Sequence, residues 1–592
     1  MNWLSRLLMW IGGIFVIFFV LALVVLVSAT SRKGMVAANT VLELDLETGL
    51  WEDKPASPLA KLHGGDMPDI RSIVFALERA ANDDRVKGLL ARMGAAPISL
   101  AQAQELRDAI AGFRAKKKFA VAFAETFGEF SAANSAYYLA TAFDEIWVQP
   151  SGDVGLNGVL MKGMFIRGTL DKLGVVPRMD QRYEYKNAMN MYTEREFTRA
   201  HEEAMAKVKD SWYGQIVRGI AEGRKLTESE IQAIIDRGPL LGPEALRERL
   251  VDGLAYRDEV FDKTRKRAGN DGKLLFLHKY ADRVDGPYSK GKKVALIHGA
   301  GAVQRGSSGY DPLMDEQTMG SETVAGAFRA AIEDRDVKAI LFRVDSPGGS
   351  YVASDTIWRE VVRARRAGKP VVVSMSTLAG SGGYFVAMAA DKIIAQPGTI
   401  TGSIGVLGGK MLMKGLYDKL GLTFDSVQSG QHAAMFDDYT DYSPTGWQRF
   451  QATLDRIYSD FTSKVAEGRK LPKEKVLEIA KGRIWTGEDA KNLGLVDELG
   501  GYPAAIRQIR QLAKFADTEP VQLVAFPKKK SLFETLLAMM QGEERESSES
   551  AGEVALARTL RILQPALRTL RAMGVTGEQP GVLTMQQQVP AR

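Results

Sequence analysis

Two glycine-rich segments in the second half of the chain hold the residue types that nucleophilic catalysis needs. DSPGGS (Asp345–Ser350) follows the apolar run AILFRV, and AGSGGYF (Ala379–Phe385) follows the apolar run PVVVSMS. In parallel sheets, sites form at the carboxyl ends of strands, and a serine in a strand-to-helix turn can stand beside bare backbone amides that stabilise an oxyanion. Ser381 is therefore the candidate nucleophile. The alternative, that these glycines only form tight turns, stays open on glycine content alone.

A serine hydroxyl needs a base to be nucleophilic at neutral pH. The chain has five histidines, and only His432 lies in a plausible segment. A lysine can serve if burial lowers its pKa from ~10.4 toward 7–8, a shift that corresponds to about 4 kcal/mol. Lys186, in YEYKNAM, is the candidate base. The alternative is an ordinary surface lysine.

The chain contains an internal repeat, with two copies of one sequence module. DDRVKGLLARM (Asp83–Met93) corresponds to DRDVKAILFRV (Asp334–Val344). Farther along, Tyr137–Gly174 aligns with Tyr384–Gly421 at a constant offset of 247, with 17 of 38 positions identical. Similarity of this kind at a fixed spacing indicates a duplication.

The two copies have lost complementary residues. At the offset of 247, Ser381 corresponds to Asn134, and Lys186 corresponds to Ala433. The first copy also has GAAPIS (Gly94–Ser99) where the second has its SPGG turn. One copy thus holds the lysine and the other holds the serine, which predicts a single composite site between them.

The elements that must position these residues alternate between strand and helix in each copy. Apolar, β-rich runs open the copies at Val41–Leu46 and Val294–Gly299. Such alternation predicts βαβ units and a largely parallel sheet, so the fold class is α/β. The polar stretch Asp285–Lys293 is the predicted join, and Glu194–Arg267 is a predicted helical subregion at the end of copy one.

Composition excludes several classes of function. The 592 residues carry a net charge of only +6, and no basic stripe suggests binding to nucleic acid. Without cysteine there are no disulfides, thiolate metal sites or cysteine nucleophiles. We find no P-loop, HExxH or Rossmann fingerprint, so we expect neither a cofactor nor a metal.

The amino terminus reads as a membrane segment. Leu7–Val27 contains 21 residues without charge, bounded by Arg6 and by Arg32 with Lys33. About 20 apolar residues span a bilayer core, so we expect an uncleaved transmembrane anchor. A cleaved signal peptide is the alternative, although the apolar run exceeds the usual 7–15 residues. Charge alone does not set the orientation.

The carboxyl-terminal tail has a different character. EERESSES (Glu543–Ser550) predicts disorder. Leucines spaced by four and three residues over Leu556–Leu570, with arginines between them, predict an amphipathic helix interrupted by Pro565. The helix could pack on a neighbouring subunit or domain, or lie on a membrane surface.

Three motifs together resemble the serine–lysine signal peptide peptidase family. They are the stretch Met375–Val406 (MSTLAGSGGYFVAMAADKIIAQPGTITGSIGV), DSPGGS at Asp345–Ser350, and RYEYKNAM at Arg182–Met189. The tandem layout with one amino-terminal anchor is similar to the double-length form of Gram-negative bacteria, signal peptide peptidase A or protease IV. The resemblance extends to about residue 525.

The resemblance implies a role for each motif residue. It implies two tandem domains with a crotonase-like and Clp-protease-like fold, Ser381 as nucleophile and Lys186 as general base. Ser403, in TGSIG, matches a serine that orients the lysine, and Gly349 and Gly382 match the oxyanion donors. It further implies a homotetramer that digests signal peptides on the periplasmic side of the bacterial inner membrane.

The predicted organisation divides the chain into four parts. They are a transmembrane anchor (1–34), a half that carries the lysine (35–290), a half that carries the serine (291–527) and a partly disordered tail (528–592). The predicted function is a membrane-anchored Ser-Lys endopeptidase acting on signal peptides and other apolar peptides, without nucleic-acid partners. A crotonase-like acyl-CoA enzyme and a catalytically silent membrane scaffold are the alternatives.

Overall fold

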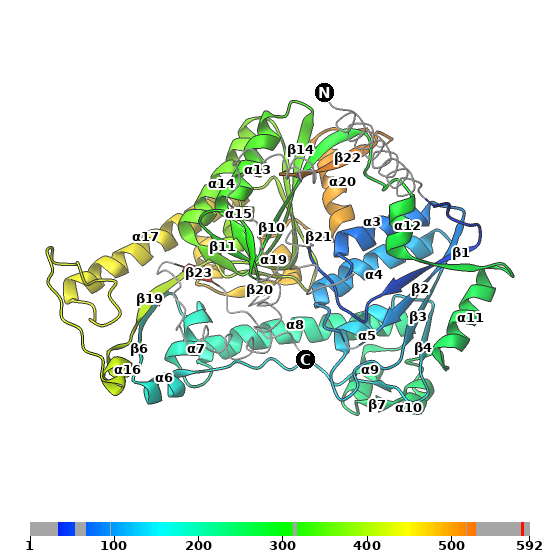
Figure 1. Ribbon diagram of the computed structural model, residues 1–592, viewed down its shortest axis with the longest axis horizontal. Helices are drawn as coiled ribbons and strands as arrows, with labels where there is room; N and C mark the ends of the chain where they lie inside the picture. Colours follow the sequence, from blue (N-terminus) through cyan, green and yellow to red (C-terminus); the bar gives the residue numbers. More distant parts are fainter. Residues whose placement is uncertain are drawn as a thin grey trace, which may run out of the picture.

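The computed structural model has a mixed α/β architecture, as the sequence predicts (Figure 1). It describes residues 34–53, 67–94, 96–311, 316–516, 518–527 and 582–584. Within these ranges, no helix has both the length and the apolar character needed to cross a bilayer. The predicted anchor Leu7–Val27 and the predicted tail helix lie outside the described residues.

The first copy builds a parallel six-stranded sheet, and six parallel strands within the eight-stranded sheet of the second copy have the corresponding order. The first runs β8-β4-β3-β2-β1-β9, and the second runs β21-β17-β16-β14-β10-β22. In these two orders β2 corresponds to β14, and β3 corresponds to β16. Strands β14 and β16 precede the two glycine-rich segments of copy two. The tandem repeat found in the sequence is therefore also a repeat of topology.

Helices connect the strands and cover the sheets. The elements of the first copy are β1 (Thr40–Asp45), α3 (Ile70–Ala81), β2 (Val86–Met93), α4 (Leu100–Ala115), β3 (Phe119–Ala124), α5 (Asn134–Ala140), β4 (Glu145–Val148), β5 (Asp153–Val154), α6 (Arg167–Leu173), β6 (Val176–Arg182), the 3₁₀ turn η1 (Asn187–Met189), α7 (Asn190–Thr193), α8 (Arg199–Arg224), α9 (Glu228–Ile235), β7 (Leu240–Leu241), α10 (Gly242–Arg247), β8 (Gly253–Leu254), α11 (Arg257–Ala268), β9 (Lys273–Phe276) and α12 (Leu277–Arg283).

The second copy repeats this plan with additions around the glycine-rich loops. Its elements are β10 (Lys292–Ala300), β11 (Ala302–Gln304), β12 (Gly309–Asp311), β13 (Glu316–Gly320), α13 (Ser321–Glu333), β14 (Val337–Ser346), β15 (Gly348–Ser350), α14 (Tyr351–Arg366), β16 (Val371–Gly380), α15 (Gly382–Ala387), β17 (Lys392–Ala395), β18 (Ile400–Gly402), β19 (Val406–Leu412), α16 (Lys414–Leu420), α17 (Pro444–Arg469), α18 (Lys473–Ile479), β20 (Ile484–Thr486), α19 (Gly487–Asn492), β21 (Glu498–Leu499), α20 (Tyr502–Leu512) and β22 (Val521–Phe526), followed in the tail by β23 (Val582–Thr584).

Local sequence explains where the principal helices begin and end. Ser99 opens α4 with a capping box, in which its hydroxyl accepts from the amide of Gln102 and the Gln102 side chain accepts from the amide of Ser99. The two 26-residue helices α8 and α17 each begin at a capping hydroxyl, on Thr198 and Ser443. The predicted helical subregion of copy one is observed, with the two short strands β7 and β8 inserted in it.

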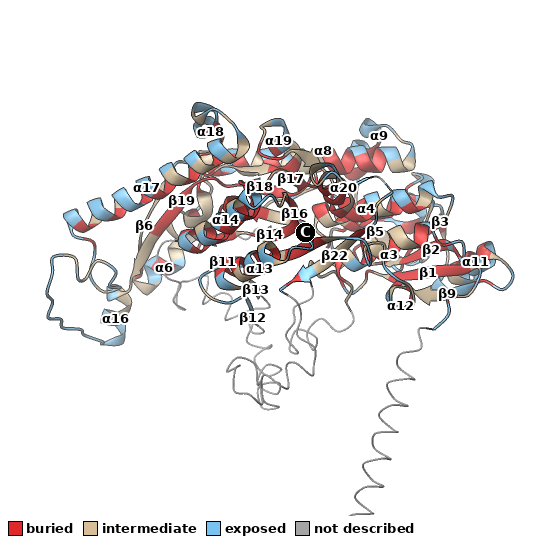
Figure 2. Cartoon of the chain, turned by 90° about the horizontal axis from the view of Figure 1, so that it is seen from above, coloured by how far each residue is buried: buried red, intermediate tan, exposed pale blue. Residues whose placement is uncertain are grey.

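The two halves share one hydrophobic core. The larger cluster of buried side chains runs from α3 and α4 of copy one into α20 and one face of the second sheet, where Leu341, Val372 and Ile506 pack with it. Figure 2 shows this continuous buried interior along the strands of both halves. Because burial of apolar surface is the main stabilising term, this shared cluster joins the two halves, and a second buried cluster lies wholly within the serine-bearing half.

One strand crosses from the first copy to the second. β6 pairs antiparallel with β19, from Val176 opposite Leu412 to Arg182 opposite Val406 (Figure 1). The chain that follows Arg182 is thereby led to the segment that follows β18 of the other copy. This pairing places Lys186 against the serine-bearing half.

A third sheet has the order β12-β13-β11-β15-β23 and contains the SPGG glycines in β15. Its last member, Val582–Thr584, belongs to the tail and lies beyond the stretches predicted to be disordered and helical, which are outside the described residues. These three residues pair antiparallel with β15, with Leu583 opposite Gly349.

Candidate active site

Ser381 sits on a sharp turn between strand β16 and helix α15. Its backbone has φ 53° and ψ −114°, which a non-glycine residue rarely adopts, and its side chain is fully buried. Two hydrogen bonds hold the turn. The amide of Ser381 donates to the carbonyl of Gly402 at 2.8 Å, and the amide of Phe385 donates to the carbonyl of Ser381 at 2.8 Å. A strained serine in a turn from a strand to a helix is the local geometry of a nucleophile elbow.

Lys186 follows β6 and points into the second copy. Its Nζ lies 2.8 Å from Ser381 Oγ, 2.9 Å from Ser403 Oγ and 2.9 Å from the Ser403 carbonyl oxygen. Lys186 and Ser381 are 195 positions apart in the chain. The structure thus brings together the three side chains that the sequence analysis selected from separate motifs.

Burial controls the charge of this lysine. Lys186 is 1% exposed, and burial lowers its pKa from the ordinary value of 10.5 to about 7. Among the described residues, no carboxylate forms an ion pair with it. Without a counter-charge to hold the proton, the amine is half neutral near pH 7, as a general base requires.

Ser403 and Gly482 close the space around the lysine. Ser403 has φ 50°, and its amide donates to the carbonyl of Arg483 at 2.8 Å. A Cβ added to Gly482 would lie 2.5 Å from the Cβ of Lys186, so only glycine lets the backbone approach this closely. Sequence analysis did not identify Gly482, because a lone glycine before a strand gives no signal of what it contacts.

The two candidate oxyanion glycines lie next to each other. A Cβ placed on Gly382 would be 3.0 Å from the amide nitrogen of Gly349 and 2.7 Å from Ser354 Oγ. Gly349 itself has φ +156° and approaches the carbonyl of Val303 too closely for a side chain. A side chain at either position would therefore meet its neighbours, and Gly382 directly follows Ser381 in the chain.

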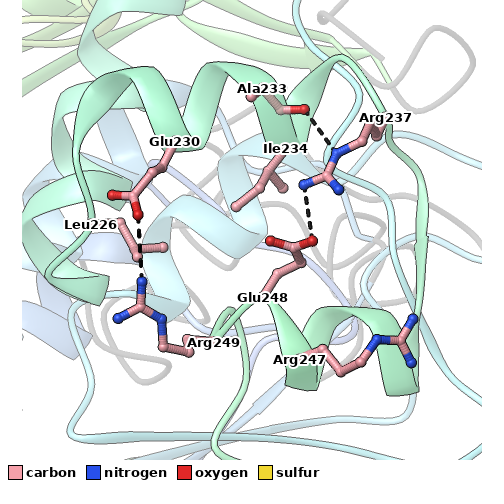
Figure 3. Close-up of a pocket in the computed structure, with 8 residues that line it drawn as sticks. All are labelled: Leu226, Glu230, Ala233, Ile234, Arg237, Arg247, Glu248 and Arg249. Atoms are coloured by element: carbon pink, nitrogen blue, oxygen red, sulfur yellow. Dashed lines mark hydrogen bonds and ion pairs between the residues drawn. The ribbon is translucent and has the colours of Figure 1, made fainter.

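The other candidates from sequence lie elsewhere. His432 packs near Gly446 at the start of α17, and the amine in contact with Ser381 is that of Lys186. The described residues contain no cluster of histidine and acidic side chains that could hold a metal. A surface pocket between α9 and α10, lined by Glu230, Arg237 and Glu248 among others, contains none of the selected residues (Figure 3).

Comparisons with known proteins identify the family of the chain. A model described as peptidase family S49 matches residues 113–271 and 363–516, one stretch in each copy. "Protease 4" of Salmonella typhi is 32% identical over 463 residues, which cover 75% of this chain and 72% of that protein. "Protease 4" of Haemophilus influenzae is 29% identical over 539 residues, which cover 85% and 84%.

A plant protein and a solved structure also match. "Serine protease SPPA, chloroplastic" of Arabidopsis thaliana is 30% identical over 459 residues, which cover 75% of this chain and 66% of that protein. A solved structure of a ClpP1 mutant from Listeria monocytogenes covers 36% of this chain and 94% of its own, with 14% identity and a TM-score of 0.23. At that TM-score, the likeness supports no conclusion about this chain.

Proposed function

This chain belongs to peptidase family S49, as a serine protease of the tandem signal peptide peptidase A type, and from that premise we propose that it cleaves peptide bonds with a dyad of Ser381 and Lys186. The observation that carries the proposal is the 2.8 Å contact between Lys186 Nζ and Ser381 Oγ at a buried position. The family match favours this function over an acyl-CoA enzyme or a silent scaffold.

The mechanism follows from the contacts of the lysine. A neutral amine has two N–H groups and one lone pair. The two N–H groups donate to the carbonyl and hydroxyl oxygens of Ser403, which leaves the lone pair facing the hydroxyl of Ser381. Lys186 takes the serine proton as Oγ attacks the peptide carbonyl, and Ser403 fixes the direction of that lone pair.

The remaining steps use the same groups. The amides of Gly349 and Gly382 donate to the oxyanion, an interaction worth about 10²–10³ in rate for each donor. Protonated Lys186 then gives its proton to the leaving amine. Water hydrolyses the acyl-enzyme with Lys186 again as the base.

The proposed substrates are extended apolar peptides, including cleaved signal peptides. An extended peptide satisfies its backbone by adding a strand to a sheet edge. The antiparallel pairing of Val582–Thr584 with β15 supports this, because it occurs at the glycine that is the proposed oxyanion donor. In the same proposal Leu7–Val27 anchors the chain in the bacterial inner membrane with its catalytic halves in the periplasm, as a homotetramer.

The test uses the full chain in detergent micelles. We expect wild type to hydrolyse a fluorogenic apolar peptide and to be acylated by a fluorophosphonate, and Ser381→Ala to do neither. Ser463→Ala, which changes an exposed serine on α17, should behave as wild type. Labelling that persists in a folded Ser381→Ala protein would assign the nucleophile elsewhere. Mass spectrometry of a synthetic signal peptide and of a polar peptide of equal length tests the substrate class.

A further inference from the structure

Strand β16, which ends at the residue before Ser381, contains a bulge. Val344 of β14 pairs with Met375, but the next paired residue, Ser346, lies opposite Ala379. One residue of β14, Asp345, therefore stands opposite three residues of β16. Bulges bend a strand and re-aim the residues that follow, and here Ser381 lies three positions after the last bulged residue, Leu378.

In a bulge some backbone amides lose their hydrogen-bond partners in the β-ladder. The side-chain carboxylate of Asp345 takes the place of one lost partner. The amide of Leu378 donates to Asp345 Oδ1 at 2.9 Å. The backbone of Asp345 is also used, because its carbonyl accepts from the amide of Gly301 at 2.9 Å. Asp345 is in turn followed by Ser346 and the glycines of the proposed oxyanion loop. Its side chain thus contacts the strand of the nucleophile, and its backbone leads into the oxyanion loop.

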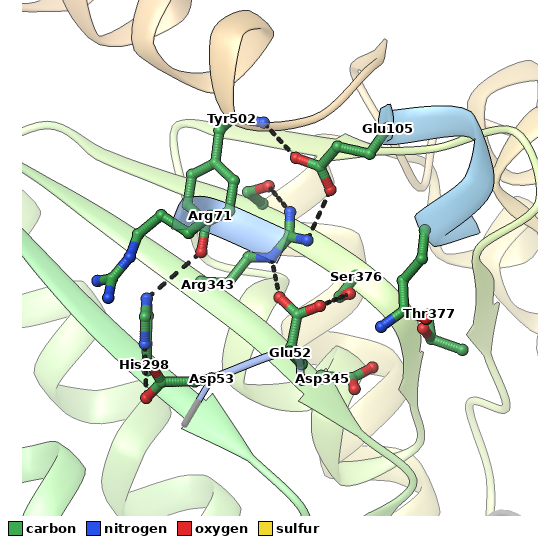
Figure 4. Close-up of polar contacts among 12 residues, drawn as sticks. Glu52, Asp53, Arg71, Glu105, His298, Arg343, Asp345, Ser376, Thr377 and Tyr502 are labelled. Atoms are coloured by element: carbon green, nitrogen blue, oxygen red, sulfur yellow. Dashed lines mark hydrogen bonds and ion pairs between the residues drawn. The ribbon is translucent and has the colours of Figure 1, made fainter. Parts of the chain in front are cut away.

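The first copy holds the other two bulged residues. Ser376 donates its hydroxyl hydrogen to Glu52, and the Thr377 hydroxyl lies 2.8 Å from that of Ser99. Glu52 lies beside Asp345 in the close-up (Figure 4). The bulge is therefore fixed from both halves of the molecule.

A buried arginine neutralises part of the acidic charge at this place. Arg343, also on β14, donates from Nε to Glu52 at 2.6 Å and from a terminal nitrogen to Glu105 at 2.7 Å (Figure 4). Its guanidinium lies 4.4 Å from the ring centre of Tyr502. Two carboxylates already share this one cation, and among the described residues no cation forms an ion pair with Asp345.

The first copy serves as an internal comparison. In the alignment of Asp83–Met93 with Asp334–Val344, Arg92 matches Arg343, and Gly94 takes the place of Asp345. There the ladder between β2 and β3 ends at Met93 opposite Ala124, the counterpart of Val344 opposite Met375, and among the described residues no strand pairing continues past that point. The arginine occurs in both copies, whereas the aspartate and the bulge occur only in the copy with the serine.

We propose that Asp345 is a positioning residue of the peptidase site, whose carboxylate holds the β16 bulge so that Ser381 and the oxyanion loop are set against each other. The inference rests on the proposed function. It deepens that function by naming the group that joins the two strand ends.

The charge state of Asp345 gives the proposal a distinctive signature. Burial, followed by the nearby Glu52 carboxylate, raises the pKa of Asp345 from 3.8 to about 7, while the amides of Leu378 and Thr377 favour its ionised form. The carboxylate is therefore ionised above about pH 7 and neutral below it. The charged and titratable groups of the surrounding network are Glu52, Asp53, Glu105, His298, Arg343 and Tyr502.

Two groups then control the acid side of the activity profile. Lys186 must lose its proton and Asp345 must lose its proton, and both do so near pH 7. The logarithm of kcat/KM should therefore fall with a slope near two per pH unit below about pH 6. With Asp345 fixed in a neutral form, the slope should be one.

The experiment compares Asp345→Asn with wild type in the full chain, by peptide hydrolysis from pH 5 to 9 and by the rate of fluorophosphonate labelling of Ser381. The matched control is Asp391→Asn, because the Asp391 carboxylate accepts from the amide of Val371 at 2.9 Å at the opposite end of the same strand. We expect Asp345→Asn to lower kcat at pH 8 at least tenfold with KM within twofold, and to reduce the slope to one. Asp391→Asn should keep the wild-type slope and kcat.

Other outcomes are equally decisive. Wild-type kcat and slope in folded Asp345→Asn, or an equal loss in Asp391→Asn, would overturn the proposal. If wild type labels at Ser381 but cleaves no peptide, the proposed function fails, and the ratio of labelling rates still tests Asp345. If Asp345→Asn does not fold, Glu52→Gln replaces it. Removing that carboxylate should move the acid limb to lower pH, and an unmoved limb would count against the assignment.

Discussion

Replacing Lys186 with methionine should abolish peptide hydrolysis and at the same time change how stability depends on pH. The substitution keeps the aliphatic stem and removes the amine. In the folded protein the pKa of this amine is about 7, against 10.5 for an ordinary lysine. The unfolded chain therefore binds more protons than the folded chain between these values, so the stability of wild type rises with pH across that window.

The size of the effect follows from the two pKa values. At 1.36 kcal/mol per pKa unit, the buried amine costs wild type about 4 kcal/mol at pH 7 and about 1 kcal/mol at pH 10. Methionine carries no such cost. The lost hydrogen bonds to Ser381 and Ser403 destabilise the variant by about 1–3 kcal/mol at every pH. The unfolding free energy of the variant minus that of wild type should therefore fall by about 3 kcal/mol from pH 7 to 10.

Urea unfolding followed by circular dichroism measures this difference. Titrating groups common to both proteins cancel, so only the amine contributes to the change with pH. Lys475→Met, at an exposed position on α18, is the control and should leave both activity and the pH dependence as in wild type. A difference between Lys186→Met and wild type that stays constant from pH 7 to 10 would refute a neutral buried amine, and with it the reasoning that makes Lys186 the base.

Three further predictions concern the same site. Ser403→Ala removes one of the two oxygens that orient Lys186, so kcat should fall about tenfold with little change in KM, and an unchanged kcat in peptide hydrolysis would contradict this role. Gly482→Ala places a methyl group 2.5 Å from the Lys186 Cβ, so both kcat and Tm should fall. If kcat and Tm both stay at the wild-type values, the loop that contains Gly482 adjusts to the methyl group and the close contact is not required. His432→Ala should retain most activity, and a large loss would move the base from Lys186 to the histidine.

Sequence alone predicted much of the fold. The repeat at a spacing of 247 predicted two equivalent modules, and the strand orders of the two sheets agree with it. Alternating apolar strands and amphipathic helices predicted a mixed α/β fold, because each pattern depends on neighbouring residues. Ser381 came from its glycine-rich strand-to-helix turn, and the comparison of the copies linked it to Lys186, since each residue is missing from the other copy.

Other features depended on pairings between distant segments. Lys186 looked like any lysine in the sequence, and only the pairing of β6 with β19 and the approach of Gly482 bury it against Ser381. The join predicted near Asp285–Lys293 did not indicate that α20 of the second half shares a hydrophobic core with the first half. Nor did DSPGGS reveal a bulge in the neighbouring strand.

Residue types, the repeat and the period of the apolar pattern are written in the sequence, and they determined the modules, the class of fold and the candidate nucleophile. The tertiary structure decided which of the chemically possible side chains meet, and in which charge state. The reason is physical, because the pKa of Lys186 is set by loss of water around the amine, and the groups that exclude that water lie up to about 300 positions away in the chain.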